Sequence, residues 1–440
     1  MDTATNSSIR VLMFPWLAYS HIHPFLELAK KLSKRNFCIY LCSTPANLAC
    51  IKEKEPSVEF VELHLPSLPE LPPHSHTTKG LPRHLLSSLM KALDMSRRSF
   101  SEILAALKPD LLISDVLQPW APAKALSLNI PTVLFMVSAA MPYCVLLDLV
   151  KISGSTALPL RSNHVHGYDY ENDDLTLQDR LLQSLEGSCN LVLIRSLREL
   201  EGKYVGELSV QAMKKIVLVG PLVQELSEEE DEKTEIMEWL NKKDPRSVLF
   251  VSFGSECYLS REDREELAHG LRLSNVSFIW VIRFPQGEKI SAEEALPEGL
   301  AEMVGEKGLF IEDWAPQKRI LSHPSVGGFL SHCGWGSIME SIGSGVPIIA
   351  MPMHVDQPVN ARLLQEVGVA LEIKREQDGK LGREEVAKVV REVVVEETGE
   401  QVRRKARELR ERIKGKDDEG MDEVVRELVK LCGWEANKPL

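Results

Sequence analysis

The sequence lacks several features that define other classes of protein. It has no pair of cysteines in a CxxC arrangement, and its eight cysteines are scattered over the 440 residues. They are Cys38, Cys42, Cys50, Cys144, Cys189, Cys257, Cys333 and Cys432. This distribution favours reduced, mostly buried thiols of an intracellular protein over a disulfide framework. An excess of basic charge is also missing, because 52 Lys and Arg face 64 Asp and Glu. The net charge of −12 argues against binding of nucleic acid, which needs a basic face.

No segment has the character of a targeting peptide or of a membrane span. The first ten residues are polar and contain no apolar stretch of the kind found in signal peptides. The longest apolar run begins at Ile130, and it is interrupted by Pro131, Pro142 and Asp148. A buried strand followed by a helix explains this run better than a bilayer segment does. The sequence therefore predicts a cytoplasmic protein without a membrane span.

Several catalytic signatures are missing as well. There is no Walker loop, no GxGxxG and no GxSxG elbow, so the motifs of phosphoryl transfer, hydride transfer and ordinary α/β hydrolases are not found. No Asp-x-Asp pair is present that would hold a diphosphate through a metal. His323, His332 and Cys333 do not suggest a metal site either, since neighbours on a strand point to opposite faces. We expect no metal and no resident cofactor.

What the chain does contain is a regular alternation of strand-like and helix-like segments. Runs of β-branched or aromatic residues begin at Ile9, Phe37, Val58, Asp110, Pro131, Asn190 and Lys215 in a first series, and at Ser247, Phe278, Gly308, Val326, Val346 and Val369 in a second. Between the first two runs, apolar residues recur at helical spacing, with Pro24 suited to the first helical turn. Strand, helix and strand at this spacing predict parallel sheets.

The length and the two series predict two domains. The first covers residues 1–223 and the second residues 237–420. Between them, residues 224–236 are acidic and have no apolar periodicity, which is typical of a solvated linker. Ligands of open parallel sheets bind outside the carboxyl ends of the strands, so both domains should carry binding residues there.

One such strand end lies in the stretch GGFLSHCGWGSIMES, at 327–341. His332 follows an apolar strand, and two glycines lead into a predicted helix. Because the first N–H groups of a helix are unpaired and carry partial positive charge, this junction can bind a phosphate. Ser337 would add a hydroxyl donor, and Glu340 could accept hydrogen bonds from a ribose. The alternative is that His332 only caps the helix.

The wider span from Trp314 to Gln357 resembles the signature box of the plant family-1 UDP-sugar glycosyltransferases. The similarity includes WAPQ, GGFLSHCGW, ES, GVPI and the final DQ. It implies an α/β protein of the GT-B fold, with two Rossmann-like domains whose parallel sheets face each other across a cleft. It also implies that a tail helix in residues 421–440 returns to the N-terminal domain. The implied reaction is inverting transfer of glucose from UDP-glucose to a hydroxyl.

The resemblance also implies a role for particular residues of the second domain. Trp314 would stack on uracil, and the backbone of Ala315 would pair with its edge. Gln317 and Glu340 would hold the ribose. The diphosphate would be held by Ser255, His332, the backbone of Gly336 and Ser337, and the sugar by Trp335, Asp356 and Gln357. Family members usually carry Asn at the position of Gly336, so one amide donor to the phosphate is missing here.

In the first domain, the resemblance places the general base at His21, just before the first helix. An imidazole with a pKa near ~6.5 can accept a proton from a hydroxyl near neutral pH. Asp115, after the fourth strand, would fix its tautomer, although a helix cap is the alternative role for this carboxylate. Ser20 replaces the usual glycine. His23 is not a family position, and we interpret it as a pocket wall or a helix-start residue.

The acceptor is predicted from the loop around His21, which resembles the subgroup that adds a sugar to a sugar already present on a flavonoid or triterpenoid. Ring faces and hydrogen-bonding groups suited to a sugar come from Trp16, Tyr19, Ser20 and His23, and an adaptable outer wall from Met136 and Met141. The partners should thus be a UDP-sugar and a small glycoside, bound by a monomer. Two alternatives stay open: direct glucosylation of an aglycone, and a catalytically weak nucleotide-sugar binder.

Overall fold

The computed structural model describes residues 8–49, 51–52, 55–153, 175–223, 235–284, 291, 294, 296–312, 314–416, 418 and 420–433. Contacts divide the chain into two compact units. In the described residues, the first unit runs to Leu222 and includes the residues from Gly415 onward, while the second runs from Val223 to Lys414. The acidic linker predicted at 224–236 lies outside the described residues, except for its last two positions.

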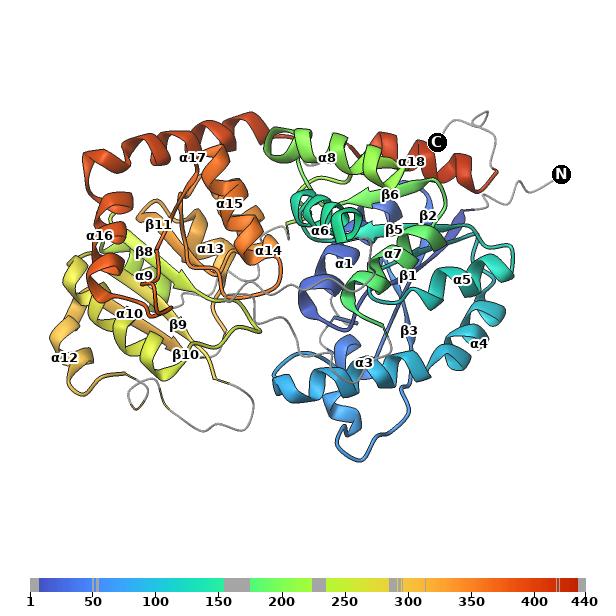
Figure 1. Cartoon of the computed structure of the whole chain (residues 1–440), viewed down its shortest axis with the longest axis horizontal. Helices are drawn as coiled ribbons and strands as arrows, with labels where there is room; N and C mark the ends of the chain where they lie inside the picture. The colour runs from blue at the N-terminus through green and yellow to red at the C-terminus, as the bar shows by residue number, and fades with distance from the viewer. Residues whose placement is uncertain are drawn as a thin grey trace. The chain divides into compact units, whose positions relative to one another are not determined.

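The first unit contains a fully parallel sheet, in which the described residues form seven strands in the order β3-β2-β1-β4-β5-β6-β7 (Figure 1). The strands are β1 (Ile9–Phe14), β2 (Phe37–Ser43), β3 (Glu59–Glu62), β4 (Leu111–Ser114), β5 (Thr132–Met136), β6 (Leu191–Ile194) and β7 (Lys215–Leu218). Successive residues of β1 enter different cores: Leu12 and Phe14 pack on one face of the sheet, and Val11 and Met13 on the other. Burial of both faces explains why these strands are continuous apolar runs.

Helices cover both faces of this sheet. They are α1 (Tyr19–Ser33), α2 (Pro45–Leu48), α3 (Leu86–Met95), α4 (Arg97–Leu107), α5 (Trp120–Ser127), α6 (Ala140–Ser153), α7 (Leu177–Gly187), α8 (Arg198–Ala212) and α18 (Met421–Leu431), with short 3₁₀ turns η1 (Pro73–Ser75) and η2 (Arg83–Leu85). The apolar run from Ile130 forms β5 and α6, as the sequence predicts. Among the described residues, none of the helices is both long enough and apolar enough to cross a bilayer.

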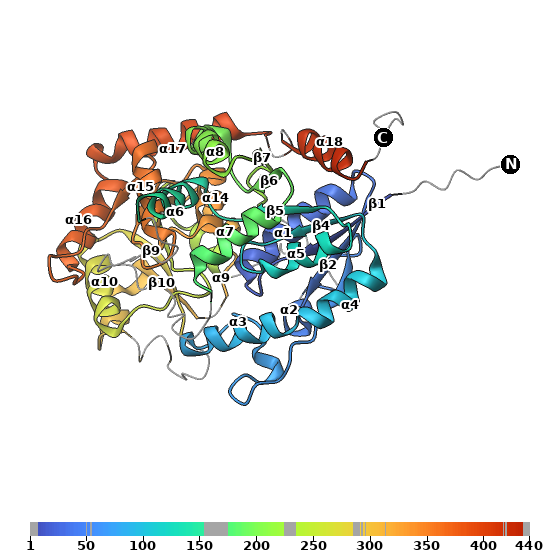
Figure 2. The same ribbon diagram turned by 45° about the vertical axis from the view of Figure 1, so that its right-hand side comes forward.

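The last helix of the chain belongs to the first unit. Met421, Val424 and Leu428 of α18 are buried in the same core cluster as Phe25 of α1. Figures 1 and 2 both show α18, in red, beside the blue and green elements of that unit. The helix therefore packs on a sheet whose strands come from the first half of the sequence.

The position of α1 corrects one prediction. The helix begins at Tyr19, so Pro24 lies inside it and His21 stands in its first turn instead of before it. Proline has no N–H to donate to the carbonyl four residues earlier, which belongs to Ser20. Ser20 is exposed, so water can satisfy that carbonyl and the helix can extend beyond the proline.

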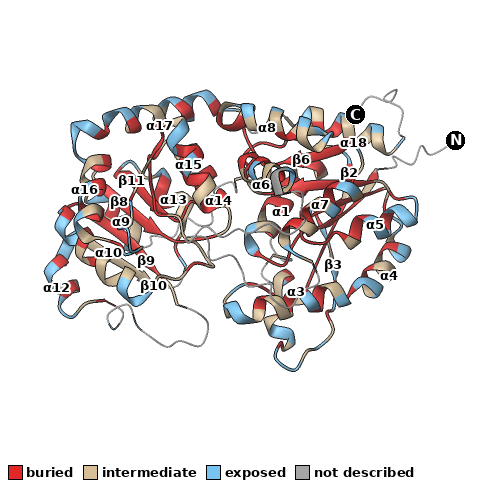
Figure 3. Cartoon of the chain, viewed as in Figure 1, coloured by how far each residue is buried: buried red, intermediate tan, exposed pale blue. Residues whose placement is uncertain are grey.

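The second unit repeats the architecture, with a parallel sheet of six strands in its described residues, ordered β10-β9-β8-β11-β12-β13. The strands are β8 (Val248–Ser252), β9 (Ser277–Ile282), β10 (Gly308–Glu312), β11 (Val326–Ser331), β12 (Ile348–Ala350) and β13 (Ala370–Glu372). The helices are α9 (Glu235–Asn241), α10 (Arg261–Ser274), α12 (Leu300–Val304), α13 (Gln317–Ser322), α14 (Trp335–Ser344), α15 (Gln357–Val367), α16 (Arg383–Val394) and α17 (Glu400–Ile413), with 3₁₀ turns η4 (Gly305–Lys307) and η5 (Glu397–Gly399). The central strands are buried and the helices expose their outer faces (Figure 3).

In both sheets, the strand order reverses beside the first strand, which is the Rossmann arrangement. In the first unit the switch lies between β1 and β4, whose last residues Phe14 and Ser114 are paired in register. In the second unit it lies between β8 and β11, whose last residues Ser252 and Ser331 are also paired. Residues that follow these strands therefore leave each sheet at the same edge, where ligands of such folds bind.

Candidate functional sites at the two switch points

The switch point of the first unit brings His21 and Asp115 together. The Nδ1 atom of His21 lies 2.7 Å from the Oδ2 atom of Asp115. Asp115 directly follows β4 and is fully buried, whereas the side chain of His21 is 22% exposed. A carboxylate can only accept, so Nδ1 carries the proton and Nε2 is the basic nitrogen. This arrangement can remove a proton from a hydroxyl, with the carboxylate stabilising the imidazolium that forms.

The Asp115 carboxylate is fixed by backbone groups on either side of the dyad. Its Oδ2 also accepts from the N–H of Trp16, at 3.2 Å, and its Oδ1 from the N–H of Val116, at 2.7 Å. The backbone N–H of Asp115 donates to the carbonyl of Phe14, at 3.2 Å. The loop after β1 and the loop after β4 are thereby joined through one buried carboxylate. No helix-cap role is needed to explain Asp115.

Sequence reasoning missed Gln118, which lies three residues after Asp115 in the same loop. Its side chain is fully buried, and neither amide atom has a hydrogen-bond partner in the part of the chain that the structure describes. The loop is held from α7, because Arg180 donates to the carbonyl of Leu117 at 3.0 Å and Ser184 to that of Val116 at 2.9 Å. The motif LQPWAP contains this glutamine, but nothing in the sequence shows that its amide is buried.

The predicted acceptor residues are distributed between surface and core. Tyr19 is 54% exposed, and its ring centroid lies 5.6 Å from that of His23, inside α1. Trp16 is buried, as are both Met136 of β5 and Met141 of α6. The side chain of Tyr19, at the start of α1, is therefore exposed, whereas neither methionine is. A role for these side chains in acceptor binding stays a prediction.

At the switch point of the second unit, His332 follows β11 and precedes α14. Cys333 adopts a left-handed conformation (φ 65°), which turns the chain sharply into the helix. Gly254 and Gly334 make room for the imidazole: a Cβ on Gly254 would lie 2.8 Å from Cε1 of His332, and one on Gly334 would lie 2.4 Å from its Nε2. The close approach of the imidazole to the backbone at both positions explains why each is occupied by glycine.

The imidazole of His332 lies in a different electrostatic environment from that of His21. His332 is buried, and its Nδ1 has no hydrogen-bond partner among the described residues. Burial and the neighbouring His354 lower the pKa of His332 to about 3, so this imidazole is neutral near pH 7. The N-cap of α14 is Gly334, without a side-chain cap. The alternative role of His332 as a helix cap therefore has no support in the structure.

Gln317 contacts both Glu340, its predicted partner in holding the ribose, and Ser337, which is predicted to hold the diphosphate. The amide Nε2 of Gln317, at the start of α13, donates to Ser337 Oγ at 3.0 Å and to Glu340 Oε2 at 2.9 Å. Trp314, just before α13, is 66% exposed, so its indole face is available to a base. Ala315 is buried, and its carbonyl accepts from the Gln317 N–H at 2.8 Å.

Of the remaining predicted donor residues, Ser255 lies in the loop after β8, Trp335 and Gly336 begin α14, and Asp356 and Gln357 are the N-cap and first residue of α15. Ser255, Gly336 and Asp356 are half-buried, while Trp335 is buried. Asp356 accepts from Asn360 Nδ2 at 3.0 Å. The amide oxygen of Gln357 accepts from the N–H of Met353 at 3.0 Å. Gln357 therefore organises its own loop, and its assignment to the sugar stays a prediction.

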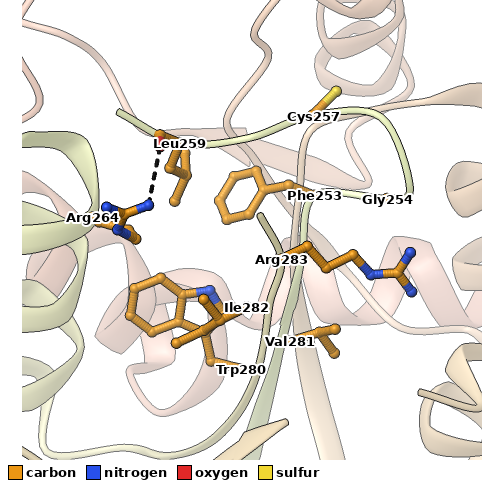
Figure 4. A pocket seen from close by; sticks show the side chains of 9 residues that line it. All are labelled: Phe253, Gly254, Cys257, Leu259, Arg264, Trp280, Val281, Ile282 and Arg283. Carbon is orange, nitrogen blue, oxygen red and sulfur yellow. Dashed lines mark hydrogen bonds between the residues drawn. The ribbon is translucent and has the colours of Figure 1, made fainter. Parts of the chain in front are cut away.

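A small hollow opens beside the loop after β8 (Figure 4). It is lined by Phe253, Gly254, Cys257, Leu259, Arg264, Trp280, Val281, Ile282 and Arg283. Arg264 donates to the carbonyl of Leu259 at 3.5 Å. Within the described ranges, no three His, Cys, Asp or Glu side chains are grouped so that they could hold a metal ion.

The fold and both switch points define a class of protein. One Rossmann-like unit presents a histidine held by a buried carboxylate, and the other presents glycines, a neutral histidine and a helix N-terminus that suit a phosphate. Together they have the components of a nucleotide-sugar glycosyltransferase of the GT-B class.

Comparison with known proteins agrees with this class. The family described as UDP-glucuronosyl and UDP-glucosyl transferase matches residues 174–405, and the glycosyltransferase N-terminal domain matches residues 7–224. Mogroside IIIx synthase of Siraitia grosvenorii is 50% identical, over 97% of this chain and 94% of that protein. The chain therefore belongs to the plant family-1 UDP-glycosyltransferases, and it is a UDP-sugar-dependent enzyme.

Two further proteins are informative. The cyanidin-3-O-glucoside 2-O-glucuronosyltransferase of Bellis perennis is 45% identical, over 98% of this chain and 99% of that protein. The structure of UGT2 from Phytolacca americana, complexed with UDP-2-fluoro-glucose and pterostilbene, matches with a TM-score of 0.79 and 28% identity, over 96% of this chain and 100% of that one. The GT-B fold predicted from the sequence is thus confirmed.

Proposed function

We propose that the protein transfers glucose from UDP-glucose to a sugar hydroxyl of a flavonoid or triterpenoid glycoside, with inversion at the anomeric carbon. The observation that carries the proposal is the contact between His21 and Asp115, because it supplies a base in the unit that would bind the acceptor. Similarity to a Bellis perennis enzyme named for a glucoside acceptor supports a glycoside as the acceptor here.

In the reaction, Nε2 of His21 takes the proton of the acceptor hydroxyl. The resulting oxygen nucleophile forms a bond to the anomeric carbon as the bond from that carbon to the UDP oxygen breaks. Asp115 faces Nδ1 and stabilises the positive charge that develops on the imidazole. The buried carboxylate is already held by two backbone N–H groups, so little reorganisation is needed when the proton moves.

UDP leaves with negative charge on its diphosphate. The unpaired N–H groups at the start of α14 point at an anion bound there, and Ser337 adds a hydroxyl donor. Because His332 is neutral, it would act on the diphosphate as a hydrogen-bond partner and not as a cation. An Nδ1 without a partner among the described residues, and close packing against two glycines, fit an imidazole whose orientation is fixed before the donor binds.

Glucose as the donor sugar is supported by the structure of UGT2 complexed with UDP-2-fluoro-glucose, at 28% identity. The name of the Bellis perennis relative specifies a glucuronosyl donor, so the donor has to be tested directly. Purified protein would be offered UDP-glucose, UDP-glucuronate, UDP-rhamnose and UDP-galactose in competition, and the products separated by mass. We expect the glucosylated product to dominate; a dominant glucuronide or rhamnoside would contradict the donor assignment.

The acceptor is tested with matched pairs of a flavonoid or triterpenoid and its monoglucoside. We expect kcat/KM to be much higher for the glucoside, since the hydrogen-bonding groups of an acceptor site reject a molecule that leaves them unpaired. The product should carry a disaccharide. Equal or higher rates on the free aglycone would show instead that the enzyme attaches glucose directly to the scaffold.

A further inference from the structure

A buried contact joins two of the loops at the switch point of the second unit. Cys257 follows β8, two residues after Ser255, and its Sγ lies 3.3 Å from Nε2 of His354, in the loop after β12. Both side chains are buried, with exposed fractions of 6% and 5%. In Figure 4 the Cys257 sulfur points away from the ring of Phe253.

The contact continues into the side chain of Gln357. Its Nε2 lies 3.5 Å from Cys257 Sγ and 3.4 Å from Nδ1 of His354. Its Oε1 accepts from the backbone N–H groups of Met353 and His354, at 3.0 and 3.1 Å. The amide is therefore used on both ends: the oxygen closes the turn, and the nitrogen connects that turn to the thiol.

The turn that these groups hold is strained. Val355, between His354 and Asp356, has a φ of 57°, which a β-branched residue rarely adopts. Such a conformation persists only where its surroundings impose it, and it is often found where a ligand is held. The next residue, Asp356, is the N-cap of α15. The contacts of Gln357 with the backbone and with Cys257 help to impose this turn.

We propose that Cys257 is a positioning residue for the sugar of the donor: its thiol fixes the His354–Gln357 turn, and with it Asp356, relative to the loop that carries Ser255. The inference rests on the proposed binding of a UDP-sugar at this switch point. It adds a residue outside the box from Trp314 to Gln357. Because the thiol acts through the sugar-holding turn and not through the diphosphate, its removal should affect UDP-sugar and UDP differently.

The experiment compares UDP-glucose with UDP on variants of Cys257, by calorimetry on the full chain. Cys257→Ala should weaken UDP-glucose binding by about five- to tenfold, the effect of one lost hydrogen bond, and leave the affinity for UDP within about twofold. KM for UDP-glucose should rise by the same factor, with a smaller change in kcat. Cys257→Ser keeps a donor and an acceptor at this position and should restore most of the affinity.

Two further variants separate positioning from packing. Cys257→Val fills a similar volume without a thiol and should behave like Cys257→Ala. It takes the place of Cys257→Ala if the cavity left by alanine prevents that variant from folding. Cys42→Ala removes a fully buried thiol from β2 of the first unit and should change neither affinity. Equal losses for UDP and UDP-glucose, no loss for either, or failure of serine to restore binding would each overturn the proposal.

The outcome is distinguishable from failure of the proposed function. If the wild-type protein binds another UDP-sugar in preference to UDP-glucose, the glucose assignment is wrong, and the same comparison is made with that sugar against UDP. A selective loss would then support the role of Cys257 although the donor differs. An equal loss of affinity for UDP and for the UDP-sugar would contradict the role of Cys257, whatever the donor is.

Discussion

Each unit carries a histidine at the switch point of its sheet, and the two histidines are used in opposite ways. His21 follows the first strand of its sheet, is partly exposed and faces the carboxylate of Asp115 at 2.7 Å. His332 follows the fourth strand of the other sheet, is buried and has no partner for Nδ1 within the described residues. A carboxylate stabilises the protonated imidazole, whereas burial without a counter-charge disfavours it. The comparison shows that the surroundings, not the residue type, decide which histidine can accept a proton.

The largest expected effect comes from removing His21, the histidine that faces a carboxylate. His21→Ala should lower kcat by roughly a hundredfold or more, because the base that activates the acceptor is lost. Affinity for UDP should be unchanged, since the donor residues belong to the other unit. Asp115→Asn should do less, because it weakens orientation while the base survives. Turnover near that of the wild type in His21→Ala would contradict the assigned mechanism.

The second effect concerns the donor unit, which should bind UDP through an aromatic platform. Trp314→Ala should weaken UDP binding by about 1–3 kcal/mol, the usual contribution of a base stacked on an aromatic ring. Trp239→Ala, in α9 of the same unit, is the matched control and should leave the affinity unchanged. Calorimetry that finds equal UDP affinity in Trp314→Ala and the wild type would exclude the uracil assignment.

The third test sharpens the contrast between the two histidines through pH. His332 has a folded-state pKa of about 3, below the ordinary 6.5, so under pH 6.5 the unfolded chain binds a proton that the folded chain does not. The free energy of unfolding should then fall by about 1.4 kcal/mol per pH unit as the pH drops below 6.5. His332→Gln should remove this contribution, measured by urea unfolding at pH 7.5 and 5.5.

The control for the pH experiment is His64→Gln, because the side chain of His64 is 74% exposed. It should keep the pH dependence of the wild type. An identical pH dependence in His332→Gln and the wild type would mean that the buried imidazole binds its proton normally, and the difference between the two histidines would then lie elsewhere.

The smallest effect compares two glutamines, one in each unit. The amide of Gln118 is buried without partners among the described residues, while that of Gln317 bonds to Ser337 and Glu340. Gln118→Leu should raise the free energy of unfolding by about 1 kcal/mol, because an unsatisfied buried amide is removed. Gln317→Leu should lower UDP affinity instead. A destabilised Gln118→Leu would show that its amide has a partner in solution.

Sequence reasoning reached the two parallel sheets for a simple physical reason, whereas the pairing of His21 with Asp115 was implied by the family resemblance. Parallel strands buried on both faces are continuous apolar runs, and residues that follow neighbouring strands meet at one edge. The family resemblance supplied the roles of these residues. Pro24 misled the prediction of the start of α1, because the exposed position of Ser20 lets water satisfy the carbonyl that the proline cannot, and the proline is tolerated inside the helix.

The sequence by itself thus determined the alternation of strands and helices and their grouping into two series of parallel strands, since both follow from local pattern. Only the tertiary structure decided the contacts, the burial and the protonation of particular side chains. Cys257 and His354 are 97 residues apart in the chain, and their contact depends on how two loops pack. The neutrality of His332 depends on burial between two glycines, which is a property of three-dimensional packing and not of any stretch of sequence.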